Sequence, residues 1–348
     1  MKRITAPNRW ISITALFTIG LAFLPALITP VYATHKIAPV TKSAAPLSGS
    51  QQIKVGVYVL NIGSLDLSTG SYNIDFYLNF SCDQPCDPGN FDIMNGKITE
   101  QENQTSDTNN RQAWYYRVRA DLITDLDMRN YPFDEHQLVI EIEDKINSKE
   151  KVLYLPDPEK SGIDQYAIVS GWELKGKPAE WFAEVIDHSY PIYNDATYSR
   201  YRYYITIYHP WPSSFLKALF APIVIVLVGL LAVLMHESKI TDRLALTTSS
   251  LVGAILYHLS IISSIPPVGY LTYMDKFMLV NYLVIAAALT VTVVMMVYKD
   301  NEFHARAKKL NHWTRGLIPL TWLVLMALIT IRQFDLTSQL IRLFNAGG

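Results

Sequence analysis

The sequence predicts an all-β domain followed by an all-α membrane domain of four helices. Short strand-like runs, several of them alternating in polarity, fill residues 53–210. Four apolar stretches of about 20 residues, the length that crosses the hydrocarbon core of a bilayer, follow within residues 211–333. The chain of 348 residues is 50% hydrophobic with a formal net charge of −1, which indicates one soluble part and one membrane part. This neutral balance gives no support for nucleic-acid binding.

The N-terminal segment, residues 1–33, has the pattern of a secretory signal peptide. It begins with basic residues, continues with an apolar run and ends in a small-residue cleavage site at Ala33. A retained membrane anchor is the alternative, although Pro25 and Pro30 interrupt a helix there. Either reading exports the segment that follows. Residues 34–52 are rich in Ser, Ala and Pro and are predicted to be a linker.

The strand-like runs predict an immunoglobulin-like sandwich over residues 53–210. After the first two strands and a polar region at 83–112 that we expect to be mostly loop, the runs lie at 114–120, 136–143, 151–155, 167–174, 180–188 and 201–208. The two cysteines, Cys82 and Cys86, could close a small disulfide loop in an oxidising compartment. They lack the nearby ligands that a zinc site needs, and no metal site is expected.

The membrane domain is predicted to hold four helices, at about 213–235, 242–262, 272–298 and 313–333, before a tail at 334–348. Basic residues concentrate between the third and fourth helices, which places that connection inside the cell. The β domain and the C-terminus then lie outside, in agreement with the export signal. We therefore expect a multi-pass protein of the bacterial inner membrane, with the β domain in the periplasm.

The second membrane helix carries a graded stripe of side chains. On a helix of 3.6 residues per turn, one face contains Asp242, Ala245, Ser249, Val252, Leu256 and Leu259. Lipid offers no partner to an acid or a hydroxyl, whereas a water-filled pathway does. Ordinary packing between membrane helices is the alternative use of the hydroxyls. Arg243 must point away from the stripe if the stripe lines a pathway, and His258 lies off it.

The run TDLDMRNYPFD, from Thr124 to Asp134, resembles the signature loop of the pentameric ligand-gated ion channels, the superfamily that includes the Cys-loop receptors. The bracketing cysteines of the animal receptors are replaced by Thr124 and Leu138, as is usual for bacterial members. The first two strands, the Asp242-Arg243-Leu244 start of the second helix and the turn at 265–270 also match. The resemblance covers about residues 50–333 and implies a homopentamer in the lipid bilayer.

The resemblance also implies a coupling zone between the two domains. Its residues would be Asp66, Asp127, Arg129, Tyr131, Pro132, Phe133, Asp134, His209, Pro266 and Pro267. His209 stands where family members usually carry an Arg, so an ion pair of the family is absent or replaced by one that depends on pH. Without the resemblance, the charges of the loop would read as an ordinary solvated turn.

Agonists in the family bind between subunits of the outer domain. Seven of the 21 tyrosines lie between Tyr190 and Tyr208, a density suited to cation–π or stacking contacts, although alternate tyrosines could equally face the sandwich core. The candidate ligand residues are Tyr190, Tyr193, Tyr198 and Tyr201 on one subunit, and Tyr77, Asn79, Arg117 and Arg119 on the next. The agonist would be a small molecule or a proton.

For the pore, five copies of Asp242 would form an acidic ring that selects monovalent cations, with Glu237 as a candidate second ring. Val252, Leu256 and Leu259 would form the gate. The expected function is a cation-selective ligand-gated channel, and the alternative is a non-conducting, membrane-tethered ligand sensor. The sequence contains no nucleophile elbow, phosphate loop or metal-spaced His cluster, so neither an enzyme nor a cofactor is expected.

Overall fold

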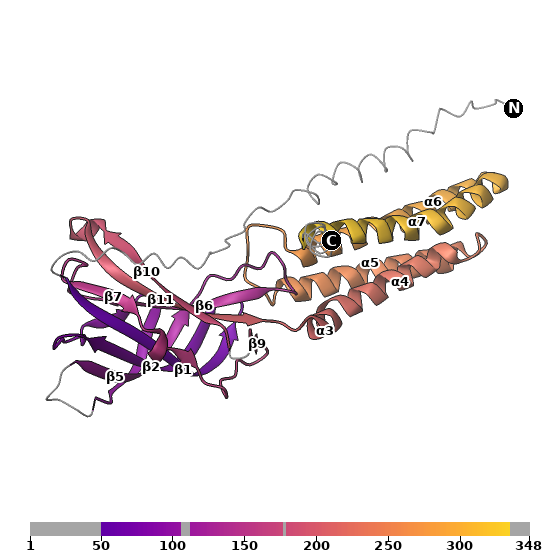
Figure 1. Ribbon diagram of the computed structural model, residues 1–348. Helices are drawn as coiled ribbons and strands as arrows, with labels where there is room; N and C mark the ends of the chain where they lie inside the picture. The colour runs from indigo at the N-terminus through magenta and orange to yellow at the C-terminus, as the bar shows by residue number, and fades with distance from the viewer. Residues whose placement is uncertain (1–49, 106–111, 177–178, 335–348) are drawn as a thin grey trace, which may run out of the picture.

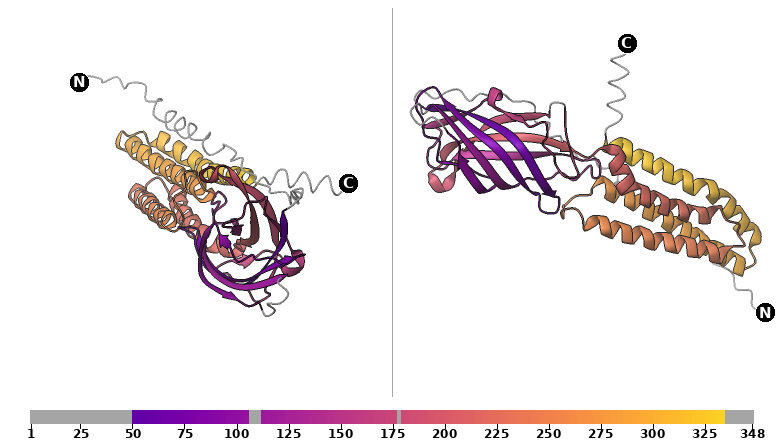
Figure 2. Two further views of the ribbon diagram at one scale, coloured as in Figure 1. Left: turned by 90° about the vertical axis from the view of Figure 1, so that its left-hand side faces the viewer. Right: turned by 90° about the horizontal axis from the view of Figure 1, so that it is seen from below.

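The computed structural model describes residues 50–105, 112–176 and 179–334. A β domain of two sheets is followed by four long apolar helices, which confirms the predicted order of the two classes (Figure 1). The predicted signal peptide, nearly all of the predicted linker and the tail beyond residue 334 lie outside the described residues. The strands and the helices lie end to end in an elongated molecule (Figures 1 and 2).

The first sheet contains six strands in the order β4-β5-β2-β1-β7, with β8 paired to β1. Their bounds are β1 Gln51–Asp66, β2 Ser71–Cys82, β4 Gly96–Asn103, β5 Ala113–Ile123, β7 Val152–Pro156 and β8 Gly162–Ile163. The strands β1 and β2 form an antiparallel hairpin that pairs Val55 with Phe80 and Val59 with Phe76. All four of these side chains are fully buried, so the register is set by the apolar face.

The second sheet contains five strands in the order β10-β11-β6-β3, with β9 paired to β11. Their bounds are β3 Phe91–Ile93, β6 Glu135–Asp144, β9 Glu173–Leu174, β10 Trp181–Tyr190 and β11 Ala196–Tyr208. The single-turn helices η1 (Pro158–Lys160) and η2 (Pro191–Tyr193) lie in the connections. The inner faces of the two sheets share one core of aliphatic and aromatic side chains, including Leu78, Val118, Ile140 and Ile205.

One local expectation was incomplete, because the region expected to be mostly loop also contains two strands, and another was wrong. The region 83–112 holds β3 and the eight-residue strand β4, which pairs with β5 at the edge of the first sheet. Almost every side chain of β4 is exposed, so the strand carries no alternation of apolar and polar residues from which it could be predicted. Conversely, residues 167–174 are mostly turns, with only Glu173 and Leu174 in a strand.

Four helical segments are long and apolar enough to cross a membrane, at Trp211–Leu234, Ile240–Ile262, Tyr273–Asp300 and His304–Gln333. The first contains α3 (Trp211–Ser214), a π-helical turn η3 (Phe215–Leu219) and α4 (Phe220–Leu234); the others are α5, α6 and α7. The last helix starts at His304, well before the predicted 313. The prediction followed the apolar run alone and left out the first turns of the helix, which carry Arg306, Lys308 and Lys309.

The irregular turn η3 has a local cause in Pro222. A proline has no N–H, so the carbonyl of Ala218, four residues earlier, has no helical partner. The hydroxyl of Tyr257 on α5 donates to that carbonyl at 2.9 Å and to the carbonyl of Lys217 at 3.1 Å. Side chains of neighbouring helices commonly satisfy backbone groups that a proline frees within a membrane, and this contact ties α5 to the start of the first span.

Candidate ion pathway and domain junction

The helices α5 and α7 are the two least covered helices of the four-helix bundle. Only 17% of the most apolar stretch of each is buried, against 44% for the first and third spans. The six residues of the predicted stripe are all exposed on α5: Asp242, Ala245, Ser249, Val252, Leu256 and Leu259. The buried residues of the helix are Arg243, Thr247, Ser250 and Ala254. The stripe therefore lies on the face of α5 that no other helix of the same chain covers.

The two acids proposed for selectivity occupy different places. The side chain of Asp242 is 56% exposed, and its only close basic neighbour in the described chain is Lys239, with Nζ 4.0 Å from Oδ2. Exposed pairs of this kind contribute at most about 1 kcal/mol. Glu237 lies in the α4–α5 connection, where Oε2 accepts a hydrogen bond from Nδ2 of Asn311 on α7 at 3.3 Å. Hydrogen bonding by its own backbone N–H helps to lower the pKa of Glu237. Its carboxylate thus faces α7 and not the stripe.

Arg243 points away from the stripe, as the pathway hypothesis requires. Its side chain is fully buried, and Nη1 donates to Oδ1 of Asn311 at 2.8 Å. His258 is also directed into the bundle, where Nδ1 lies 2.9 Å from the hydroxyl of Tyr282 and Nε2 lies 3.0 Å from Oδ1 of Asp275. Both groups hold α5 to its neighbours, and neither is on the exposed face.

The loop from Thr124 to Asp134 forms the principal contact between the two domains. Its Leu126 and Met128 are buried in a small apolar cluster with Ile265 from the α5–α6 connection. The backbone N–H of Met128 donates to the hydroxyl of Tyr270 at 3.0 Å. The guanidinium of Arg129 lies 4.6 Å from the centre of the Tyr270 ring, a cation–π contact. The junction is therefore apolar at its centre, with hydrogen bonds around it.

The same loop also contacts α6 and the end of α7. The carbonyl of Arg129 accepts hydrogen bonds from the N–H of Tyr273 at 2.9 Å and from Nε2 of Gln333 at 3.2 Å. The rings of Phe133 and Phe334 lie 5.8 Å apart, and those of Phe133 and Tyr273 6.0 Å apart. The sequence reasoning missed Gln333 and Phe334, because nothing near them in the sequence marks a contact with a loop some 200 residues earlier.

At the end of this loop, Asp134 is the centre of a buried cluster. Its Oδ2 lies 2.5 Å from Nε2 of His136, and its Oδ1 lies 3.5 Å from Nδ1 of His209. The ring of Trp172 stacks on His209 at 3.5 Å and meets His136 edge-on at 5.1 Å. Burial alone would raise the pKa of Asp134, but its interactions with His136 and His209 outweigh burial and lower that pKa to about 2. His209 therefore occupies the place of an ion-pair partner, and Trp172 is a member that the sequence reasoning missed.

The other predicted coupling residues bond within their own loops or lie in the turn after α5. The carboxylate of Asp66 accepts hydrogen bonds from Ser68 and Thr69 in the β1–β2 turn, which lowers its pKa. Asp127 pairs with Arg129 at 2.8 Å. The Tyr131–Pro132 bond is cis, and Tyr131 packs against both apolar clusters of the junction. Pro266 is half-buried and Pro267 exposed.

Three of the candidate ligand tyrosines form one aromatic cluster on the β10–β11 hairpin. The ring of Tyr190 lies 5.9 Å from Tyr193 and 5.5 Å from Tyr198, in both cases edge to face. Nη2 of Arg200 donates to the hydroxyl of Tyr190 at 2.8 Å. Tyr201 is different: it is fully buried in the sandwich core, so it offers no surface to a ligand.

The candidate ligand residues of the opposing face lie on the first sheet, and some of them already form ion pairs or hydrogen bonds within the chain. Arg117 pairs with Asp75 at 2.8 Å, and Arg119 with both Asp75 and Glu100. Asn79 is buried and donates to the carbonyl of Trp114, whereas Tyr77 is 36% exposed. These residues and the tyrosine cluster belong to different sheets of the sandwich.

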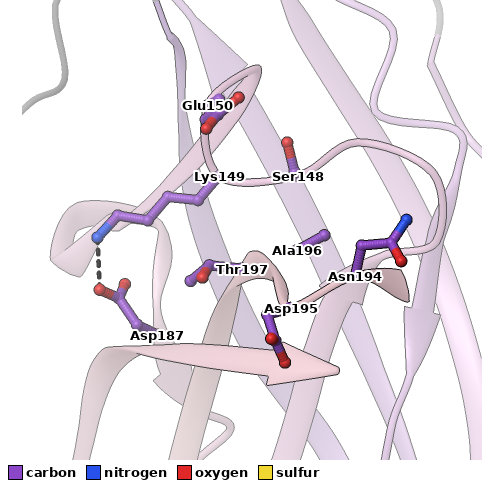
Figure 3. A pocket seen from close by; sticks show the side chains of 8 residues that line it. All are labelled: Ser148, Lys149, Glu150, Asp187, Asn194, Asp195, Ala196 and Thr197. Atoms are coloured by element: carbon purple, nitrogen blue, oxygen red, sulfur yellow. Dashed lines mark hydrogen bonds and ion pairs between the residues drawn. The ribbon is translucent and has the colours of Figure 1, made fainter. Parts of the chain in front are cut away.

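A pocket of about 420 Å³ lies beside the hairpin, between the β6–β7 connection and the hairpin tip (Figure 3). Its lining is polar: Ser148, Lys149, Glu150, Asp187, Asn194, Asp195, Ala196 and Thr197. Nζ of Lys149 pairs with Oδ2 of Asp187 at 2.6 Å across it. The pocket lies on the same β10–β11 hairpin as the tyrosine cluster and contains charged groups of both signs.

Away from the junction, Cys82 and Cys86 are joined by a disulfide beside the polar region that follows β2. Among residues 50–105, 112–176 and 179–334, no group of three His, Cys, Asp or Glu side chains could hold a metal ion.

No family model matches the sequence. The chain is 22% identical over 208 residues to a curated protein of Gloeobacter violaceus described as a proton-gated ion channel. The match covers 60% of this chain and 56% of that protein, so it spans just over half of the relative's length. The chain is a distant homologue of this ion channel, which is not an enzyme. Its β domain of two sheets followed by four apolar helices fits the architecture of the pentameric ligand-gated ion channels.

Proposed function

We propose that the chain is the subunit of a homopentameric ligand-gated channel that conducts monovalent cations. One observation carries the proposal. The stripe of α5, which begins with Asp242, is exposed in the single chain, while the adjacent Arg243 is buried. An exposed acid and hydroxyls on a membrane helix need water or a partner, and a symmetric ring of the same helices supplies both. Distant homology to an ion channel supports this use of the stripe over simple packing.

In this proposal each level of the stripe has its own role. Five Asp242 carboxylates at one mouth concentrate cations, because a ring of one sign raises the local counter-ion concentration. Val252, Leu256 and Leu259 form the shut gate, since an apolar constriction excludes water. Their side chains are 51%, 63% and 57% exposed, which leaves them free to meet their copies. Glu237 contributes less than Asp242, because its carboxylate is held by Asn311.

The agonist, a small molecule or a proton, binds between neighbouring subunits of the β domain. The tyrosine cluster of one subunit, Tyr190, Tyr193 and Tyr198, would face Tyr77 and Arg117 of the next. The separation of the two sets on different sheets supports a site shared by two chains. The relative's description as proton-gated supports the proton as one candidate.

Binding opens the gate through the junction. The loop from Thr124 to Asp134 contacts the α5–α6 connection through Met128 and Tyr270, so a movement of the sandwich is transmitted to the outer end of α5. Such coupling requires that these contacts differ between the shut and open states. The β domain and C-terminus lie in the periplasm and the four helices in the inner membrane, as the basic residues at the end of α6 and in the first turns of α7 support.

Reconstitution of the purified protein into planar bilayers tests the proposal. We expect single-channel currents that reverse near the sodium equilibrium potential in a NaCl gradient, and five-fold symmetric particles by electron microscopy. A folded protein that binds ligands but conducts no ions over a broad range of pH and small amines or acids would instead be the membrane-tethered sensor. A tetramer or a monomer would also overturn the proposal.

A further inference from the structure

Three polar residues form a chain within the helical bundle, at the end far from the β domain. Nη1 of Arg243 on α5 donates to Oδ1 of Asn311 on α7 at 2.8 Å. Nδ2 of Asn311 donates in turn to Oε2 of Glu237, in the α4–α5 connection, at 3.3 Å. Arg243 is fully buried and Asn311 is 3% exposed. A single amide thus holds the inner end of α5 against α7.

The charge of Arg243 is poorly matched by this arrangement. Within the described chain, no carboxylate lies within 4.0 Å of its guanidinium, and Nε and Nη2 have no hydrogen-bond partner. A second guanidinium, that of Arg315, donates to the same carbonyl, Met235, that Arg243 approaches at 3.5 Å. A buried unpaired charge is strongly unfavourable, so Arg243 depends on its one short hydrogen bond, to Asn311.

The neighbour of Arg243 in the sequence is Asp242, the first residue of the exposed stripe. Successive residues of a helix are about 100° apart, and an arginine side chain is long enough to bring its charge round to the adjacent face. An Arg243 that lost its buried partner would gain hydration there, beside the Asp242 carboxylate. Five such charges would oppose the five carboxylates.

We propose that Asn311 is a positioning residue for ion selectivity: it keeps Arg243 inside the bundle, so that Asp242 alone sets the sign of charge at this mouth. The inference rests on the proposed cation channel. It gives α7, the last helix of the chain, a role in selecting the ion that passes α5, although α7 carries no residue of the stripe.

The test compares permeability ratios of sodium to chloride, from reversal potentials in a NaCl gradient. Asn311→Leu, which cannot hydrogen-bond to Arg243, should lower the ratio about fivefold, because a unit charge a few ångströms from the ion path acts directly on its energy. The double variant Arg243→Gln with Asn311→Leu should restore the wild-type ratio, because it has no charge to release. Asn311→Asp should keep the ratio, since it gives Arg243 a carboxylate partner.

Asn281→Leu is the matched control. Asn281 is also a fully buried amide of the bundle, but its Oδ1 accepts from Nε1 of Trp322 and it does not touch Arg243. The Asn281→Leu variant should be less stable than the wild type but keep its sodium-to-chloride permeability ratio. If Asn311→Leu fails to assemble, Asn311→Ser, which is too short to reach Arg243, gives the same comparison. An unchanged ratio in these variants, or an equal loss in the single and double variants, would overturn the inference. A wild-type protein that passes no cations would overturn the proposed function instead.

Discussion

The buried carboxylate of Asp134 should stabilise the domain junction in a way that depends on pH. Asp134 is 1% exposed and meets His136 at 2.5 Å and His209 at 3.5 Å. Its pKa is lowered from 3.8 to about 2, despite the opposing effect of burial. Each unit of pKa shift corresponds to 1.36 kcal/mol, so the ionised form contributes about 2 kcal/mol to the free energy of unfolding.

The sign follows from the direction of the shift. Because the folded-state pKa lies below the unfolded one, the contribution is complete above about pH 4 and is lost as the pH falls towards about 2. Asp134→Asn should therefore lower the free energy of unfolding by about 2 kcal/mol at neutral pH. The deficit should shrink towards zero between about pH 4 and pH 2, where the wild-type carboxylate also loses its charge.

Denaturant melts of the detergent-solubilised protein measure this difference, with the fluorescence of Trp172, which stacks on His209, as a local reporter. Asp127→Asn is the matched control, because Asp127 is a 52% exposed acid of the same loop paired only with Arg129. It should change stability by less than about 1 kcal/mol. A deficit in Asp134→Asn that stays the same from neutral to acid pH would refute the electrostatic account of the cluster.

Three further variants probe other parts of the molecule. Val252→Ser, which makes the proposed gate polar, should raise the open probability without agonist in single-channel recordings; unaltered closed times would remove Val252 from the gate. Tyr270→Phe leaves the N–H of Met128 without its acceptor and should destabilise the junction by about 1 kcal/mol and shift the agonist response to higher concentration. An unshifted response would mean that this bond does not take part in coupling. Replacing Cys82 and Cys86 by serine should lower the free energy of unfolding by about 2 kcal/mol, as the closure of so short a loop implies, and leave conduction unchanged; equal melts with and without reductant in the wild type would contradict this.

The order of the domains could be predicted from the sequence because its signals are long and uniform. A membrane span is a run of apolar residues that no tertiary contact needs to explain, and α5 shows its stripe by spacing alone. The start of α7 could not be found in this way, because its charged first turns extend the helix beyond the apolar run. The edge strand β4 escaped prediction because both of its faces are polar.

The same difference between local patterns and distant contacts explains which site residues could be predicted. Tyr198 and Tyr201 are three residues apart on β11, so they point to opposite faces of the sheet, and only Tyr198 belongs to the tyrosine cluster while Tyr201 lies in the sandwich core. That parity is readable in the sequence once the strand is placed. The partners Asn311, Gln333 and Trp172 could not be read, because each acts through a contact with a distant segment. Local sequence marks which residue is polar, whereas the fold decides what that residue meets.

The central claim is that the exposed acid of α5 faces the ions. The reversal potential of Asp242→Arg in a NaCl gradient tests it most directly, with the wild type measured in the same bilayers. The wild-type current should reverse near the sodium equilibrium potential, and the variant current should move towards that of chloride. A variant that conducts with the wild-type reversal potential would place Asp242 away from the ion path and contradict the assignment of the stripe.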